Sequence, residues 1–166
     1  MIAYDVDKKR LGTKALFDLK GPEAALSNWC GDHLPAFPDQ PNTCTQEGET
    51  FLLLIGKLHW LLIAELSQEA TLEKTLKPAD APSDISIVRV SDTQSFFQIT
   101  GNDADQILSI ASPLDVHRTV FPENGATFTE AFKLKALILR CPGGFWIAVE
   151  QSFGDMMDDS LTRAMS

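Results

Sequence analysis

The amino-acid sequence predicts an α+β fold made of two copies of one ββαβββα repeat, and two matches between distant segments carry this prediction. Residues Phe17 to Ala24 and Phe97 to Ala104, 80 positions apart, share Phe, an aliphatic residue, Gly, an acidic residue and Ala at the same spacing. Further along, His59 to Ile63 lines up with Phe145 to Val149 at an offset of 86, and both begin an apolar strand with aromatic residues. Such self-similarity is the sequence signature of a repeated structural unit.

Each copy of the repeat opens with a strand, which we expect at Ile2 to Val6 and at Ile85 to Val90. The matched segment follows as a second strand that ends at a glycine. The acidic residue two places later favours the positive amino end of a helix dipole. Helices are therefore expected over 22–30 and 103–111.

Three short strands and a closing helix complete each copy. The strands are expected over 43–46, 50–55 and 58–64 in the first copy, and over 126–131, 133–140 and 145–150 in the second. Glycine-containing turns separate the last two strands of each set. The closing helices are expected over 67–77 and 152–164, with Ser67 and Ser152 as N-caps, because a serine oxygen can accept a hydrogen bond from a free backbone N–H at a helix start.

The length of the chain predicts a single domain over residues 1–166. A chain of 166 residues, 44% of them apolar, can bury a sizeable core without disulfide or metal support. The two repeats occupy about 1–77 and 85–166, and the segment 78–84 has the proline and polar content of a linker. Each repeat is too small to bury its own sheet face well, so we expect the two to combine.

Charge and cysteine content indicate a cytoplasmic protein that binds neither nucleic acid nor membrane. The chain has 14 basic and 23 acidic residues, a net charge of −9, which repels phosphate backbones and acidic lipid surfaces. The apolar region from Phe51 to Leu66 is interrupted by polar residues and is better explained by a buried hairpin than by a membrane span. The three cysteines of the chain are odd in number and far apart, which is typical of reduced thiols in a cytosolic protein.

One cluster of charged residues is a candidate binding site, namely Asp115, His117 and Arg118. In an extended segment Asp115 and His117 point to the same side, where the carboxylate could orient and charge the imidazole. A structural ion pair explains the same cluster, and this alternative stays open. Of the other histidines, we expect His59 to be a partly buried ring bonded to a neighbour and His33 to be a surface residue. No histidine spacing predicts a metal site, and no glycine-rich motif predicts a dinucleotide site.

A set of residues spread over about 97–164 matches a known family in order and spacing. The matching positions are Phe97 to Gly101, Ala104, Leu108, Pro113 to His117, Phe121-Pro122, Gly125, Thr129 and Glu150 to Phe153. In these positions the second half resembles the gamma subunit of heterotetrameric sarcosine oxidase, and the first half fits the same family more loosely. That family is related to the tetrahydrofolate-binding domain of the glycine-cleavage aminomethyltransferase. The resemblance implies two swapped ββαβββα repeats.

The resemblance also implies a function, that of a non-catalytic member of a complex that oxidatively demethylates sarcosine and passes the one-carbon unit to tetrahydrofolate. The implied partners are alpha, beta and delta-type subunits. In the family, flavin belongs to the beta subunit, NAD and the folate-binding half to alpha, and zinc to delta. No catalytic residue and no cofactor are therefore expected on this chain alone.

A second hypothesis is a small stand-alone tetrahydrofolate-binding or aminomethyltransferase-related protein. Asp115 would then anchor a pterin, with His117 beside it, and Arg118 would pair with a glutamate tail, because an arginine fork matches a carboxylate. A third is a stand-alone relative with a different ligand.

Overall fold

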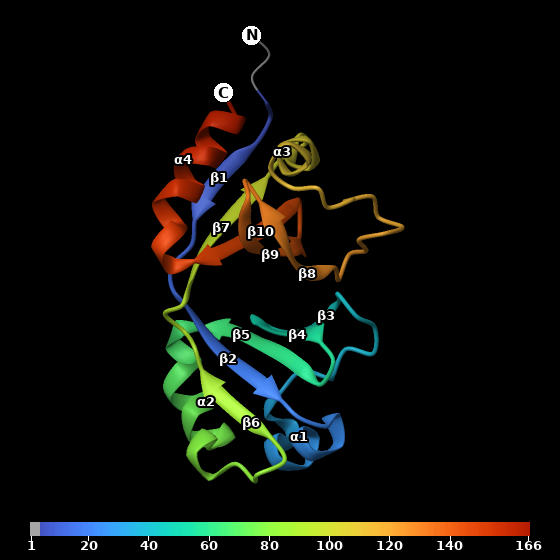
Figure 1. Cartoon of the computed structure of the whole chain (residues 1–166), viewed down its shortest axis with the longest axis vertical. Coiled ribbons are helices and arrows are strands. Elements are labelled where there is room, and N and C mark those ends of the chain that lie inside the picture. The colour runs from blue at the N-terminus through green and yellow to red at the C-terminus, as the bar shows by residue number, and fades with distance from the viewer. Residues whose placement is uncertain (1–3) are drawn as a thin grey trace. The chain divides into compact units, whose positions relative to one another are not determined.

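Two five-stranded antiparallel sheets, each in its own structural unit, form the architecture of the computed structural model, which describes residues 4–166 (Figure 1). One unit holds Thr13–Asp92. The other holds the amino-terminal segment up to Gly12 together with Thr93–Ser166. The chain therefore passes from one unit to the other twice, at residues 12–13 and at residues 92–93. The predicted α+β class is confirmed.

The unit Thr13–Asp92 is a sheet with two helices packed on one face. Its strands are β2 (Lys14–Lys20), β3 (Cys44–Glu47), β4 (Thr50–Gly56), β5 (His59–Glu65) and β6 (Ser86–Arg89), in the spatial order β3-β4-β5-β2-β6. Its helices are α1 (Glu23–Cys30) and α2 (Glu69–Leu76), and short 3-10 turns lie at η1 (Gly31–His33), η2 (Leu66–Gln68) and η3 (Pro78–Asp80). Leu26 of α1 and Leu76 of α2 are fully buried in one core cluster with Phe17 and Leu62 of the sheet.

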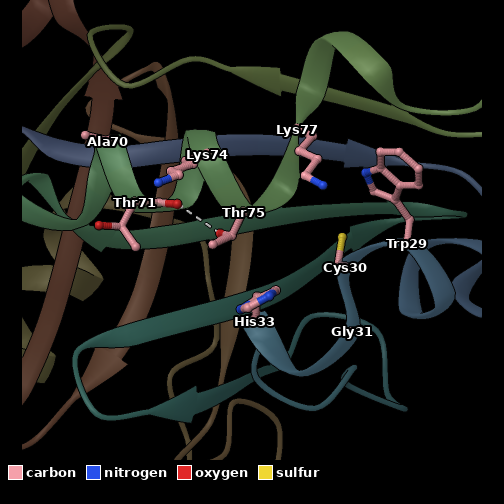
Figure 2. Close-up of a pocket in the computed structure, with 9 residues that line it drawn as sticks. All are labelled: Trp29, Cys30, Gly31, His33, Ala70, Thr71, Lys74, Thr75 and Lys77. Atoms are coloured by element: carbon pink, nitrogen blue, oxygen red, sulfur yellow. Dashed lines mark hydrogen bonds between the residues drawn. The ribbon is translucent and has the colours of Figure 1, made fainter.

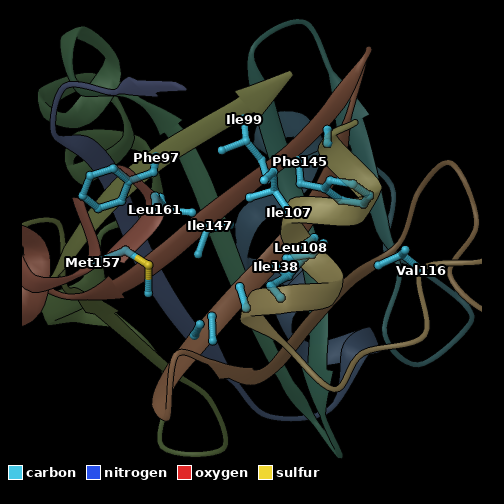
Figure 3. Packing of buried hydrophobic residues seen from close by; sticks show 14 of the residues in the cluster. Phe97, Ile99, Ile107, Leu108, Val116, Ile138, Phe145, Ile147, Met157 and Leu161 are labelled. Carbon is cyan, nitrogen blue, oxygen red and sulfur yellow. The ribbon is translucent and has the colours of Figure 1, made fainter. Parts of the chain in front are cut away.

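The second unit repeats this arrangement. Its strands are β1 (Asp7–Arg10), β7 (Gln94–Thr100), β8 (Ala126–Ala131), β9 (Leu134–Cys141) and β10 (Gly144–Glu150), in the order β1-β7-β10-β9-β8. Its helices are α3 (Ala104–Ala111) and α4 (Gly154–Ala164), the latter preceded by the 3-10 turn η4 (Gln151–Phe153). Figure 3 shows the core of this unit, where Ile107 and Leu108 of α3 and Leu161 of α4 pack with Phe97 and Phe145 of the sheet.

Both units confirm the swapped ββαβββα pattern, because the first strand of each repeat joins the sheet of the other. β1 precedes the unit Thr13–Asp92 in the chain but pairs with β7, while β6 pairs with β2. The registers correspond, since Arg10 lies opposite Phe97 and Arg89 lies opposite Phe17. The duplication noted in the sequence is thus repeated in the strand pairing.

An arginine on each exchanged strand also contacts the closing helix of the unit that the strand joins. Arg10 pairs with Asp155 of α4 at 2.7 Å, and Arg89 lies 3.6 Å from Glu69 and 3.7 Å from Glu73 of α2. Exposed pairs such as these contribute only about 0–1 kcal/mol each. These ion pairs link each exchanged strand to the closing helix of the sheet that it joins.

The predicted helices and most strands lie within two residues of their expected bounds, but the first strand does not. We predicted it over Ile2 to Val6. Residues 4–6 are not in a strand, and residues 1–3 lie outside the described part of the chain. The strand is instead the polar segment Asp7–Arg10, which forms through its ladder with β7 and through Lys8, whose Nζ donates to Asp158 Oδ1 at 2.5 Å. Its stabilisation is therefore not visible as an apolar pattern.

Two further expectations about local structure are wrong. Ser67 and Ser152 are not N-caps, because α2 and α4 are each preceded by a 3-10 turn, and Gln68 and Phe153 occupy the cap positions without a side-chain cap bond. Ser152 donates instead to Glu150 at 3.0 Å.

The second sequence match is also displaced by one residue. Leu19 lies opposite Trp60, and the equivalent Ile99 lies opposite Phe145, so Trp60 corresponds to Phe145 and not to Trp146. A one-residue slip exchanges the two faces of a strand. Trp60 therefore belongs to the core cluster under the helices, whereas Trp146 lies on the opposite face, edge-on to Phe96 at a centroid distance of 6.2 Å.

Gly21 and Gly101, matched in the sequence, have the same structural role. Their φ angles are +133° and +134°. A Cβ on Gly21 would lie 2.8 Å from the Asp84 carbonyl oxygen just before β6, and a Cβ on Gly101 would overlap the Asp5 carbonyl oxygen just before β1. Both glycines thus leave room for the entry of an exchanged strand.

A buried arginine, Arg140 of β9, positions the long loop between α3 and β8. Its side chain is 6% exposed, its Nε donates to the Phe121 carbonyl at 3.1 Å, and its Nη2 donates to the Val116 carbonyl at 2.5 Å. The guanidinium also lies over the rings of Phe121 and Phe145, at 5.5 and 4.8 Å from their centroids. Burial lowers the pKa of Arg140, and the positive charge of Arg118 acts in the same direction.

We predict that Gly101→Ala and Gly21→Ala each lower the free energy of unfolding by about 2 kcal/mol, because alanine must adopt a strained φ and meet the backbone of the exchanged strand. Urea unfolding followed by circular dichroism measures the change. Gly12→Ala is the control, since a Cβ at Gly12 meets nothing within 4 Å. Equal midpoints for Gly101→Ala and Gly12→Ala would contradict the proposed role.

We predict that Arg140→Leu lowers the free energy of unfolding by about 3 kcal/mol, because two carbonyl oxygens lose a charged donor. Trp60 and Phe145 are equivalent in the two units, and they lie opposite Leu54 and Arg140. Leu54 therefore corresponds to Arg140, which is why leucine is the replacement. Arg163→Leu, which removes an exposed arginine from α4, should change stability by only about 0.5 kcal/mol. Faster amide exchange at Phe121 in Arg140→Leu is also expected, and unchanged exchange there would show that the loop does not need Arg140.

Candidate functional site

The structure places Asp115, His117 and Arg118 together in the exposed loop between α3 and β8. Asp115 Oδ1 accepts a hydrogen bond from the backbone N–H of His117 at 2.9 Å, and the His117 ring Nδ1 lies 2.8 Å from Thr119 Oγ1. Arg118 forms an ion pair with Glu123. Each predicted side chain thus has a partner within its own loop, and the carboxylate of Asp115 contacts backbone where the sequence suggested the imidazole.

This loop has a defined conformation because Arg140 binds the carbonyls on either side of His117. Val116 O and Phe121 O are the two acceptors, so the segment with His117 and Arg118 bulges outward between two fixed points. The result is a surface loop that presents the His117 imidazole, the Arg118 guanidinium and the carboxylates of Asp115 and Glu123 to solvent. For Arg118 to bind an anion, its ion pair with Glu123 must first be broken.

The other predicted histidines are where the sequence suggested. The His59 ring pairs with Asp18 of the neighbouring strand and is partly buried, and His33 is exposed in η1. These two observations confirm the expectations for both residues.

None of the three cysteines forms a disulfide, and Cys30 and Cys44 are buried while Cys141 is partly buried. Burial raises the pKa of Cys30 to about 11 and that of Cys44 to about 11, and it also raises the pKa of Cys141. Because the thiolate is the nucleophile, these thiols are poor nucleophiles at neutral pH. Within residues 4–166, no three His, Cys, Asp or Glu side chains are arranged to hold a metal ion.

A pocket that the sequence did not predict lies in the unit Thr13–Asp92 and has a volume of about 750 Å³. Figure 2 shows α2 on one side of this pocket, and the end of α1 with the turn η1 on the other. The lining residues are Trp29, Cys30, Gly31, His33, Ala70, Thr71, Lys74, Thr75 and Lys77. We call this the α1–α2 pocket. Its volume is in the range of small-molecule sites.

Sequence reasoning missed the α1–α2 pocket because its two walls are about 40 residues apart in the chain. The available signal was the polar face of α2, where Thr71, Lys74 and Thr75 follow helical spacing opposite the buried Leu72 and Leu76. That pattern alone is typical of a solvated helix face. Only the position of Trp29 and His33 across from it makes the face one wall of a pocket.

A smaller pocket of about 450 Å³ lies beside the turn between β4 and β5. It is lined mostly by apolar residues, among them Leu54, Leu58 and Trp60, with Lys57 as its one charged residue. No described helix is long and apolar enough to cross a membrane.

Comparisons with solved structures show what this fold is similar to. A chain of the heterotetrameric sarcosine oxidase from Corynebacterium sp. U-96 in complex with pyrrole 2-carboxylate matches with a TM-score of 0.80 and 24% identity, over 96% of this chain and 83% of that one. The glycine cleavage system aminomethyltransferase T from Bartonella henselae matches with a TM-score of 0.69 and 13% identity, over 96% of this chain and 46% of that one.

A more distant likeness is to the regulatory subunit of aspartate kinase from Thermus thermophilus, with a TM-score of 0.53 and 11% identity over 99% of this chain and 100% of that one. No curated protein sequence matches the chain. At these identities the structural matches show the fold, including its similarity to the aminomethyltransferase family.

Sequence comparison with protein families shows the relationship itself. The model of the family described as "Sarcosine oxidase, gamma subunit family" matches residues 24–165, which run from the second residue of α1 to the end of α4 and leave out β1 and β2. This span includes the whole of the second repeat from β6 to α4 and the larger part of the first. The chain belongs to the sarcosine oxidase gamma subunit family.

Proposed function

We propose that this chain is a non-catalytic, gamma-like subunit of a heterotetrameric sarcosine oxidase-type complex linked to tetrahydrofolate one-carbon metabolism. The family match over residues 24–165 carries the proposal. The likeness of the fold to a chain of a heterotetrameric sarcosine oxidase supports it. In such a complex, alpha, beta and delta-type subunits would be the partners, and flavin and NAD would be held by them.

The chemistry of the side chains agrees with a subunit that does not itself catalyse. The candidate acid and base in the loop between α3 and β8 are bonded to their own loop, and the thiols have raised pKa values. A location in the cytoplasm and the combination of both units into a single domain remain predictions.

We expect the tagged chain, purified from its native host, to retain flavin-bearing partner chains in fixed ratio. The eluate should oxidise sarcosine, whereas the chain produced alone should not. The same tag on an unrelated acidic protein of similar size is the control, because a net charge of −9 can retain proteins nonspecifically. Recovery of the chain alone after mild cross-linking in the cell would contradict the proposed subunit role.

The alternative is a small tetrahydrofolate-binding or aminomethyltransferase-related protein. The specific observation in its favour is the fold, which matches the aminomethyltransferase T over 96% of this chain. Asp115, His117 and Arg118 would then form the ligand site. The carboxylate of Glu123 already pairs with Arg118, as the carboxylate of a glutamate tail would.

Under this alternative, isothermal titration calorimetry of the isolated chain with tetrahydrofolate should detect binding, and Arg118→Gln should weaken it about tenfold or more, since a charged hydrogen bond contributes about 1.5–3 kcal/mol. Glu123→Gln should tighten binding, because it frees Arg118. Arg163→Gln is the charge-matched control. Absence of heat at millimolar ligand would remove the alternative and leave the subunit proposal untouched.

A further inference from the structure

We propose that the α1–α2 pocket is a binding site for a small organic anion with two or more negative charges. The inference rests on the pocket's own residues and does not depend on whether the chain assembles with other subunits. Three observations carry it: the charge of the lining, the way the helix ends are satisfied, and the aromatic wall.

The lining of the α1–α2 pocket is cationic in an acidic protein. The chain has 23 acidic and 14 basic residues, yet the pocket is lined by Lys74, Lys77 and His33 and by no carboxylate. Seven of the 14 lysines and arginines of the described chain pair with acids, namely Lys8, Arg10, Lys14, Lys20, Arg89, Arg118 and Arg163. Lys74 and Lys77 form no ion pair among residues 4–166. Their charge is therefore available to a ligand.

Two of the carbonyls at the end of α2 have partners other than a lysine side chain. Lysines near a helix carboxyl end often serve the free carbonyls there. Here the Leu76 carbonyl accepts a hydrogen bond from the Trp29 indole N–H at 2.7 Å, and the Glu73 carbonyl accepts the backbone N–H of Lys77 at 3.2 Å. An indole and a backbone group thus occupy these acceptors, and the ammonium groups can point to the pocket.

The walls set the kind of anion. Lys74, in the last turn of α2, and Lys77, the left-handed residue that follows the helix, both line the pocket, so they can meet two negative groups of one molecule. Figure 2 shows Trp29 beside Lys77, and His33 on the opposite wall of the pocket. Trp29 is held by its bond to Leu76 and is partly exposed, so its ring offers a fixed apolar surface. A volume of about 750 Å³ fits a small molecule and not a macromolecular segment.

The test titrates the full chain with citrate and, separately, with inorganic phosphate at constant ionic strength, by calorimetry and tryptophan fluorescence. We expect citrate to bind with a dissociation constant of at most millimolar order and to change the fluorescence, because Trp29 lines the site. Trp29→Phe should remove the fluorescence change, although Trp60 and Trp146 remain. Phosphate has no carbon skeleton, so phosphate binding as tight as citrate binding would overturn the proposal that the site selects an organic anion.

Two double variants decide whether the α1–α2 pocket is responsible. Lys74→Gln/Lys77→Gln should weaken citrate binding about tenfold or more. Lys9→Gln/Lys133→Gln removes the same charge from exposed lysines elsewhere, and it is closely matched because Lys77 and Lys133 both have positive φ, at 46° and 66°. That control should bind citrate within about twofold of the original chain, since distant exposed charges are screened by salt.

Equal losses in the two double variants would show a nonspecific charge effect and overturn the proposal. No binding of citrate at millimolar concentration would overturn it as well. Thermal unfolding of all variants checks that they fold, and a citrate-dependent rise in the unfolding temperature that is present in the control and lost in Lys74→Gln/Lys77→Gln would support the site independently.

Discussion

The pairing of an exchanged strand with the strand that leads into a helix is the constraint on which both units depend. β1 supplies the outer partner of β7, and β6 supplies that of β2. Without these partners, the backbone N–H and C=O groups on one side of β7 and β2 would lose their ladder bonds. Neither unit is therefore a continuous stretch of sequence. The requirement also explains why glycine is found at both Gly21 and Gly101, where the exchanged strand passes too close for a side chain.

The same architecture has been stabilised in two chemical ways at one position. In the second unit Arg140 fills the space beside Phe145 and binds the carbonyls of the neighbouring loop, whereas in the first unit Leu54 lies opposite Trp60. A buried guanidinium needs acceptors, and the loop between α3 and β8 supplies them. Leucine needs none, and in this unit Phe37 packs edge-on against Trp60 at a centroid distance of 5.3 Å. The two repeats therefore differ in whether this position is tied to a loop by hydrogen bonds.

The sequence predicted the repeat, the fold class and most elements because these depend on short-range patterns. It missed β1 because this strand is polar and is stabilised by partners more than 80 residues away. The signal that could have found it is the repeat itself, since Arg10 corresponds to Arg89 and would have placed the first strand beside β6 in the alignment.

The loop residues Asp115, His117 and Arg118 were predicted as a cluster, but their hydrogen bonds follow from the turn at that loop, which composition does not reveal. The α1–α2 pocket depends on two segments that only the fold brings together.

The distribution of positive charge separates the two candidate sites physically. A cation that already has a carboxylate partner can bind an anion only by exchanging one carboxylate for another, so its net gain is small in water. Arg118 is in this position, because Glu123 holds it. Lys74 and Lys77 have no such carboxylate partner among the described residues. The carbonyls of Leu76 and Glu73 beside them are bonded to the Trp29 indole and to backbone. In a protein with a net charge of −9, a concave surface without carboxylates is also where repulsion of an incoming anion is weakest. The more conspicuous cluster in the sequence is thus the less available one in the structure.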